Sequence, residues 1–106
     1  MLGVLYHVED MLAYLRRAAA MTSDLLVLET ETRLNFLPWP AARYFPGASL
    51  ANDPTNFWGP NIAWLQIALK ELGFGRIEVR PNPCARWHRR VWVKRHVVHA
   101  WRAPAA

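Results

Sequence analysis

The chain lacks the features of several protein classes. Its 106 residues contain a single cysteine, Cys84, so no internal disulfide forms and no second thiol completes a zinc or redox site. No apolar run approaches the roughly 20 residues that cross a bilayer, and no secretory signal opens the chain. No P-loop or nucleophile elbow is present. These absences predict a soluble, cytoplasmic protein without metal or hydrolase chemistry.

Acidic residues are nearly absent from the last third of the chain. Residues 1–75 hold five Lys or Arg and seven Asp or Glu, whereas residues 76–106 hold eight Lys or Arg and one acid, Glu78. Basic residues and tryptophans are interleaved there: Arg86, Trp87, Arg89, Arg90, Trp92, Lys94, Arg95 and Trp101. Stacking rings beside phosphate-pairing cations suit RNA or another acidic partner. The alternative is a solvated β-hairpin whose tryptophans face the core.

The first third of the chain has the pattern of an α/β domain. Apolar residues at helical spacing predict a helix over residues 8–21. Residues 25–28 form a continuous apolar run without alternation, which predicts a strand covered on both faces, as in a parallel sheet flanked by helices. The 53% hydrophobic content suffices for a packed core.

The rest of the chain predicts one long loop, a second helix and a hairpin. Residues 33–60 are rich in proline and aromatic residues, which indicates a loop that binds something or acts as a lid. Asn61 has the position of an N-cap for a helix that Gly73 ends. Strands over residues 76–80 and 91–101 then predict a closing antiparallel hairpin.

The block Gly3-Val4-Leu5-Tyr6-His7 is the most informative segment. It has the pattern of a buried strand's end that leads into a helix, which is where open α/β sheets bind ligands. Such a strand needs others before it, and almost nothing precedes it here. We therefore expect the chain to be the second half of a larger α/β domain.

Four blocks of residues, in order, carry a resemblance to a known family. They are Gly3-Val4-Leu5-Tyr6-His7, Leu26-Val27-Leu28-Glu29-Thr30, Asn56-Phe57-Trp58-Gly59-Pro60-Asn61 and Leu72-Gly73-Phe74. Together they resemble the C-terminal half of class I S-adenosylmethionine-dependent methyltransferases, in particular the bacterial tRNA wobble-uridine carboxymethyl- and methyltransferase group and its uncharacterised relatives. The resemblance spans the whole chain. It implies that residues 1–106 form one partial domain, with part of a Rossmann-like sheet, flanking helices and a substrate-side loop at residues 33–60.

The resemblance also implies cofactor-binding positions. Tyr6 matches a tyrosine that contacts S-adenosylmethionine, and Leu2 stands where the tRNA enzymes carry a methionine. Arg95 matches the first arginine of a late strand that reaches the cofactor. From position alone, Tyr6 is equally a core tyrosine with a solvated hydroxyl.

Four further residues are candidates for substrate binding. His7 lies at the predicted strand end and suits a base or an orienting group, with a structural histidine as the alternative. Glu29 ends the next strand, where its carboxylate suits a substrate hydroxyl or amine, a missing partner segment or plain solvent. Asn56 and Trp58 lie in the long loop, where they could close over a flat nucleobase or another aromatic acceptor. The alternative is that this aromatic-rich loop packs on itself.

Two parts of a complete methyltransferase site are missing. The glycine-rich turn after the first strand and the acidic residue after the second are not in this sequence, whose one Gly-x-Gly pattern, at residues 73–75, ends a helix. His96 and His99 fall on opposite faces of a predicted strand, which argues against a two-histidine metal site. We therefore expect a fragment that is inactive alone, self-associates through an unpaired sheet edge and needs its N-terminal half or a complementing chain.

Overall fold

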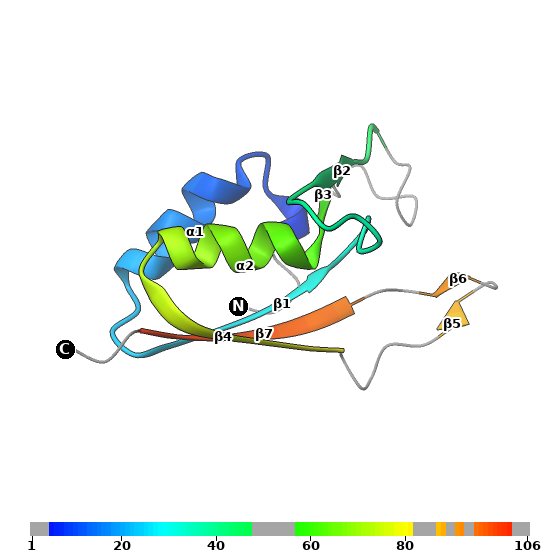
Figure 1. Ribbon diagram of the computed structural model, residues 1–106. Coiled ribbons are helices and arrows are strands. Elements are labelled where there is room, and N and C mark those ends of the chain that lie inside the picture. The colour runs from blue at the N-terminus through cyan, green and yellow to red at the C-terminus, as the bar shows by residue number, and fades with distance from the viewer. Residues whose placement is uncertain (1–4, 48–56, 82–86, 89–90, 93–94, 103–106) are drawn as a thin grey trace.

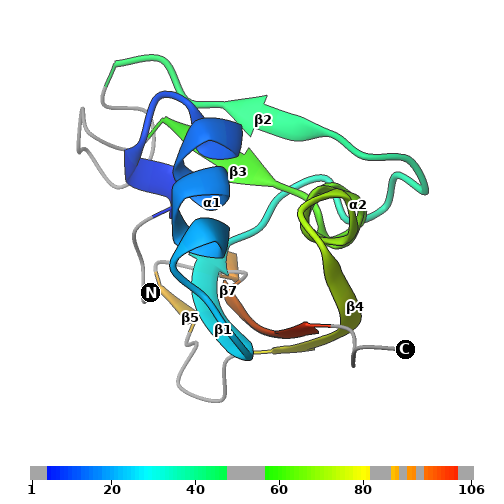
Figure 2. The ribbon, with the colours of Figure 1, turned by 90° about the vertical axis from the view of Figure 1, so that its left-hand side faces the viewer.

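A computed structural model describes residues 5–47, 57–81, 87–88, 91–92 and 95–102. Its elements are η1 (Leu5–His7), α1 (Met11–Ala20), β1 (Leu25–Glu31), β2 (Ala42–Tyr44), β3 (Trp58–Pro60), α2 (Ile62–Glu71), β4 (Phe74–Pro81), β5 (Trp87–His88), β6 (Val91–Trp92) and β7 (Arg95–Arg102). Strands β1, β7 and β4 form the main sheet, and both helices lie on one of its faces (Figures 1 and 2). The described part is thus an α/β arrangement of two layers.

The two helices form where local signals place them. Asp10 caps α1, with its Oδ1 accepting from the Ala13 amide at 2.9 Å. The predicted start at residue 8 was therefore too early, because this cap lies two residues later. Asn61 caps α2, as predicted, and the buried residues of α2 are Leu65, Ala68 and Leu69. Neither of these helices is long and apolar enough to cross a membrane.

The sheet is antiparallel, which contradicts the parallel sheet predicted from residues 25–28. Strand β7 lies in the centre and pairs antiparallel with both β1 and β4. Leu26 and Leu28 face the helices and are buried, whereas the intervening Val27 points to the other face and is half-buried. An apolar residue on that second face made β1 look like a strand buried on both sides. The predicted antiparallel pairing of the last two long strands is confirmed.

The segment before α1 also differs from its prediction. Leu5–His7 is one 3-10 turn and no strand end, closed by the Val8 amide on the Leu5 carbonyl at 3.4 Å. The turn brings the chain to the Asp10 cap and buries Leu5 completely in the core. Residues 1–4 lie outside the described residues, as does any strand there.

Arg102, at the end of β7, holds the C-terminal ends of both helices. Its guanidinium donates to the Leu72 carbonyl at 2.7 Å after α2, and to the Ala19 and Thr22 carbonyls at the end of α1. Gly73 has a φ of +99° and lies against this guanidinium, where a Cβ would come within 2.6 Å of Nη1. Glycine is therefore required there for backbone conformation and for space.

The segment of residues 33–60 is less irregular than predicted. Strands β2 and β3 pair antiparallel within it, and residues 48–56 lie outside the described residues. The side chain of Asn61 fastens the segment to α2: its Nδ2 donates to the Trp39 carbonyl at 2.8 Å and to the Leu34 carbonyl at 3.3 Å, and its Oδ1 accepts from the Ala41 amide at 3.0 Å. Leu34 has a φ of +62° at this turn.

Candidate functional site

The carboxyl end of β1 combines polar side chains with deep burial. Four consecutive residues there are buried: Glu29, Thr30, Glu31 and Thr32. Strand β7 begins at the same edge of the sheet, with Arg95 opposite Glu31. Buried carboxylates and hydroxyls destabilise a fold unless they form ion pairs or hydrogen bonds. The partners of these four residues therefore determine which groups at the end of β1 could contact a ligand.

Glu29 and Arg95 form an ion pair across the two strands. The Arg95 Nε donates to Glu29 Oε2 at 3.1 Å, and Nη2 donates to Oε1. Two parallel hydrogen bonds fix the plane of the guanidinium as well as its position. The structure therefore brings together two residues that the sequence proposed separately, one for substrate and one for cofactor.

Glu31 forms a second ion pair, with Arg33 just after the strand. Burial raises the pKa of Glu31 above its ordinary value, while the charges of Arg33 and Arg95 oppose that rise and Glu29 adds to it. Two carboxylates and two guanidiniums thus lie together at the end of β1. The sequence analysis missed Glu31 and Arg33, although a Glu-x-Glu-x-Arg pattern at a strand end is a usable signal.

A hydrogen-bond network lies beside the ion pairs. Thr32 Oγ1 and His96 Nδ1 are 2.8 Å apart, and Asn35 Nδ2 donates to the same hydroxyl at 3.0 Å. The Asn35 Oδ1 in turn accepts from the Ile62 amide at 2.9 Å, at the start of α2. The end of β1 is therefore connected to β7 and to the first turn of α2.

The two histidines of β7 lie on opposite faces, as the spacing predicted. His96 contacts Thr32, whereas His99 lies on the face that carries Val97 and Trp101. Among the described residues, no group of three His, Cys, Asp or Glu side chains is placed to hold a metal ion.

Trp58 of β3 and His7 of η1 take no part in these ion pairs. The two elements that carry them, β3 and η1, contact each other and also contact β1. The Trp58 indole donates from Nε1 to the Glu9 carbonyl at 2.9 Å, and its ring lies 5.2 Å from that of Tyr44. Strand β3 thereby packs against the segment of η1, which includes His7. Trp58 fixes the loop segment to the N-terminal turn, which favours the packing alternative for this residue.

The remaining candidate positions lie outside what the structure describes. These are Leu2, Asn56 and the side chain of Tyr6, together with Arg86, Arg89, Arg90 and Lys94 of the basic third. Between β4 and β7, the backbone of the basic third is described at β5 and β6, which pair antiparallel with Trp87 opposite Trp92. The predicted cofactor contact of Tyr6 and the predicted RNA contacts stay predictions.

No protein family model matches this sequence, and no curated protein matches it.

Proposed function

We propose that this chain forms the C-terminal part of a class I S-adenosylmethionine-dependent methyltransferase domain and is inactive alone. The observation that carries the proposal is the Glu29–Arg95 pair at the carboxyl end of β1. Open α/β sheets bind their ligands beyond the carboxyl ends of their strands. The four blocks of residues that resemble this family supply the reaction class.

The course of the chain supports the same proposal. Strands β1 and β4 are both antiparallel to β7, so they run in the same direction, and α2 lies between them in the chain. Helix α2 covers one face of the sheet (Figure 2). Two strands of the same direction joined through a helix are the crossover unit of α/β domains. A partial Rossmann-like sheet, in which the last strand of the chain inserts antiparallel between two strands of the same direction, would have this arrangement.

The described residues fit part of the cofactor. The Arg95 guanidinium is the kind of group that pairs with a carboxylate such as that of S-adenosylmethionine, and Glu29 fixes its orientation. When bound, the cofactor supplies the methyl group for an in-line displacement. The chain's own share is to orient donor and acceptor and to exclude water. The glycine-rich turn and the acidic strand end that complete the site are absent from this sequence.

Calorimetry with S-adenosylmethionine tests the proposal on two proteins. The 106-residue chain is expected to bind weakly or not at all, and micromolar or tighter binding would mean that the site is complete without another half. A longer protein, translated from the coding sequence upstream in the same frame, is expected to bind the cofactor and to transfer methyl groups. In that protein Arg95→Gln should weaken cofactor binding about tenfold, the usual range for losing one charge-assisted hydrogen bond.

The control variant is Arg16→Gln, which removes a guanidinium from the exposed side of α1. It should leave cofactor binding unchanged. A longer protein that transfers no methyl group but binds RNA in a salt-dependent way would refute the proposal. That result would favour the alternative, a non-enzymatic module that binds RNA or an acidic partner through its Arg/Trp-rich hairpin.

A further inference from the structure

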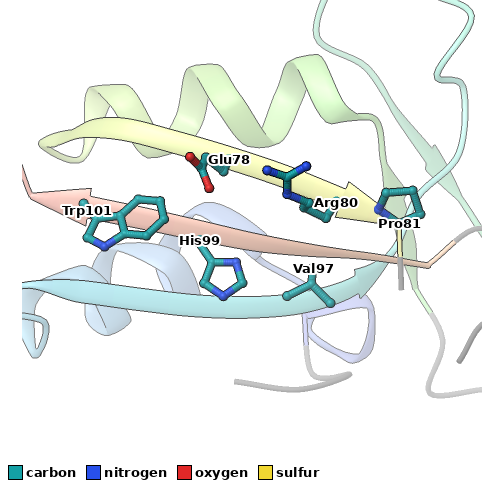
Figure 3. Close-up of a pocket in the computed structure, with 6 residues that line it drawn as sticks. All are labelled: Glu78, Arg80, Pro81, Val97, His99 and Trp101. Carbon is teal, nitrogen blue, oxygen red and sulfur yellow. The ribbon is translucent and has the colours of Figure 1, made fainter. Parts of the chain in front are cut away.

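The face of the sheet opposite the two helices carries a shallow depression. Its lining comes from alternate residues of β4 and β7 and from the last residue of β4: Glu78, Arg80, Val97, His99, Trp101 and Pro81 (Figure 3). Its volume is about 440 Å³. Among the described residues both helices cover the other face, so these side chains form an open surface (Figure 2). The volume lies within the range of small-molecule sites, roughly 300–1,000 Å³.

Three side chains are stacked along one end of this surface. The guanidinium carbon of Arg76 lies 4.5 Å from the centre of the Trp101 ring, and the rings of Trp101 and His99 are stacked at 5.8 Å with 21° between their planes. Val97 is the next residue of β7 on this face and extends the row beyond His99 (Figure 3). A planar ring lying on Val97 would continue the stack against the imidazole.

The charges around this position favour an anionic ligand. Arg76 is paired with Glu78 at 2.7 Å, and this hydrogen bond holds the pKa of Glu78 below its ordinary value. Arg80 is exposed, pairs in register with Val97 and forms no ion pair with any described carboxylate. Its charge also helps to lower the pKa of Glu78, and its guanidinium lies at the depression, where it can donate to a phosphate.

We propose that this depression binds a nucleotide, with the base stacked on His99 over Val97 and the phosphate paired with Arg80. Aromatic rings on an open sheet face suit bases of any sequence, because every base has a flat face. The site is distinct from the basic hairpin at β5 and β6, since its lining comes from β4 and β7. It goes beyond the methyltransferase proposal and does not depend on it.

The experiment uses the 106-residue chain and the probe 5′-AMP. Nuclear magnetic resonance should show saturable shifts in the side-chain signals of Trp101 and His99. Arg80→Gln should weaken 5′-AMP binding about tenfold and leave adenosine, which lacks the phosphate, unaffected. His99→Ala should weaken both ligands, and the control Arg16→Gln should weaken neither.

A short single-stranded oligoadenylate distinguishes the source of the nucleotide. Tighter binding of the oligomer, with the same dependence on Arg80, would identify the ligand as a nucleotide within a single-stranded nucleic acid. Tighter binding of 5′-AMP would identify it as a free nucleotide. Three results would overturn the proposal. They are shifts confined to residues 87–92, 5′-AMP binding that is unchanged in Arg80→Gln, and the absence of a saturable shift at Trp101 and His99. Arg80 is exposed on the sheet surface, so its variant is expected to fold.

Discussion

Replacing Asn61 by alanine should destabilise this protein more than replacing Asp10, the N-cap of the other described α-helix. The side chain is completely buried and makes four hydrogen bonds. Oδ1 accepts from the Trp64 amide at 2.8 Å, which caps α2, and from the Ala41 amide at 3.0 Å. Nδ2 donates to the carbonyls of Leu34 and Trp39. One amide group thus holds the helix start and the loop after β1 together.

The magnitude follows from these contacts. An N-cap lost to alanine costs about 1 kcal/mol, with a range of roughly 0.5–2. Each of the three other hydrogen bonds contributes about 1 kcal/mol net, and more where a buried backbone group is left without a partner. The sum for Asn61→Ala is about 4 kcal/mol. That is a large part of the roughly 5–15 kcal/mol by which domains are stable.

Urea unfolding at low protein concentration measures this difference, with Asp10→Ala as the matched control. Asp10 caps α1 through the corresponding amide, that of Ala13 at 2.9 Å, but it is exposed, and its side chain makes only that one hydrogen bond among the described residues. Its loss should cost about 1 kcal/mol. Equal effects of the two variants would refute the reasoning, because the contacts to the loop would then contribute nothing.

Two further predictions concern the end of β1 and the helix ends. Burial raises the pKa of Glu31 from its ordinary 4.5, so the folded state binds this proton more tightly than the unfolded chain. The stability of the wild type relative to Glu31→Gln should therefore fall as pH rises from 4.5 through the raised pKa, and urea unfolding across pH that shows a rise would contradict this. Arg102→Met removes three donors from the carbonyl ends of α1 and α2 and should cost about 2–4 kcal/mol in the same assay. A cost no larger than that of Arg16→Met, on an exposed helix surface, would show that these contacts are not stabilising.

Sequence reasoning located the helices because their signals are local. The capping amide of Asn61 and the left-handed Gly73 act within a few residues of the helix that they delimit. Such signals are readable in a single sequence. The contacts of Arg102 cannot be predicted from a single sequence, because they join the end of β7 to carbonyls that lie 30 to 83 residues earlier in the chain. No local pattern marks an arginine that serves two helix ends.

The strand direction was mispredicted for a physical reason. An apolar run in β1 signals burial but does not encode the direction of the neighbouring strand. The centre of this sheet is β7, which pairs with β1 at a separation of about 70 residues, for example at Leu28 and Val98. Similarly, residues 5–7 carry a strand-like composition, but they form a 3-10 turn that buries Leu5 in the core just before the Asp10 cap.

The end of β1 differs from the rest of the core because it carries buried charges. Leu26 and Leu28 fill the space beneath the helices, and buried Thr30 continues that face of the strand. The opposite face, which carries Val27, ends in two buried carboxylates, each paired with an arginine from a different segment, Arg95 of β7 and Arg33 of the following loop. Burying such charges costs free energy that an apolar pair of similar volume would avoid. The charged cluster at the carboxyl end of β1 therefore adds little to stability, which agrees with the orienting role that we propose for the Glu29–Arg95 pair.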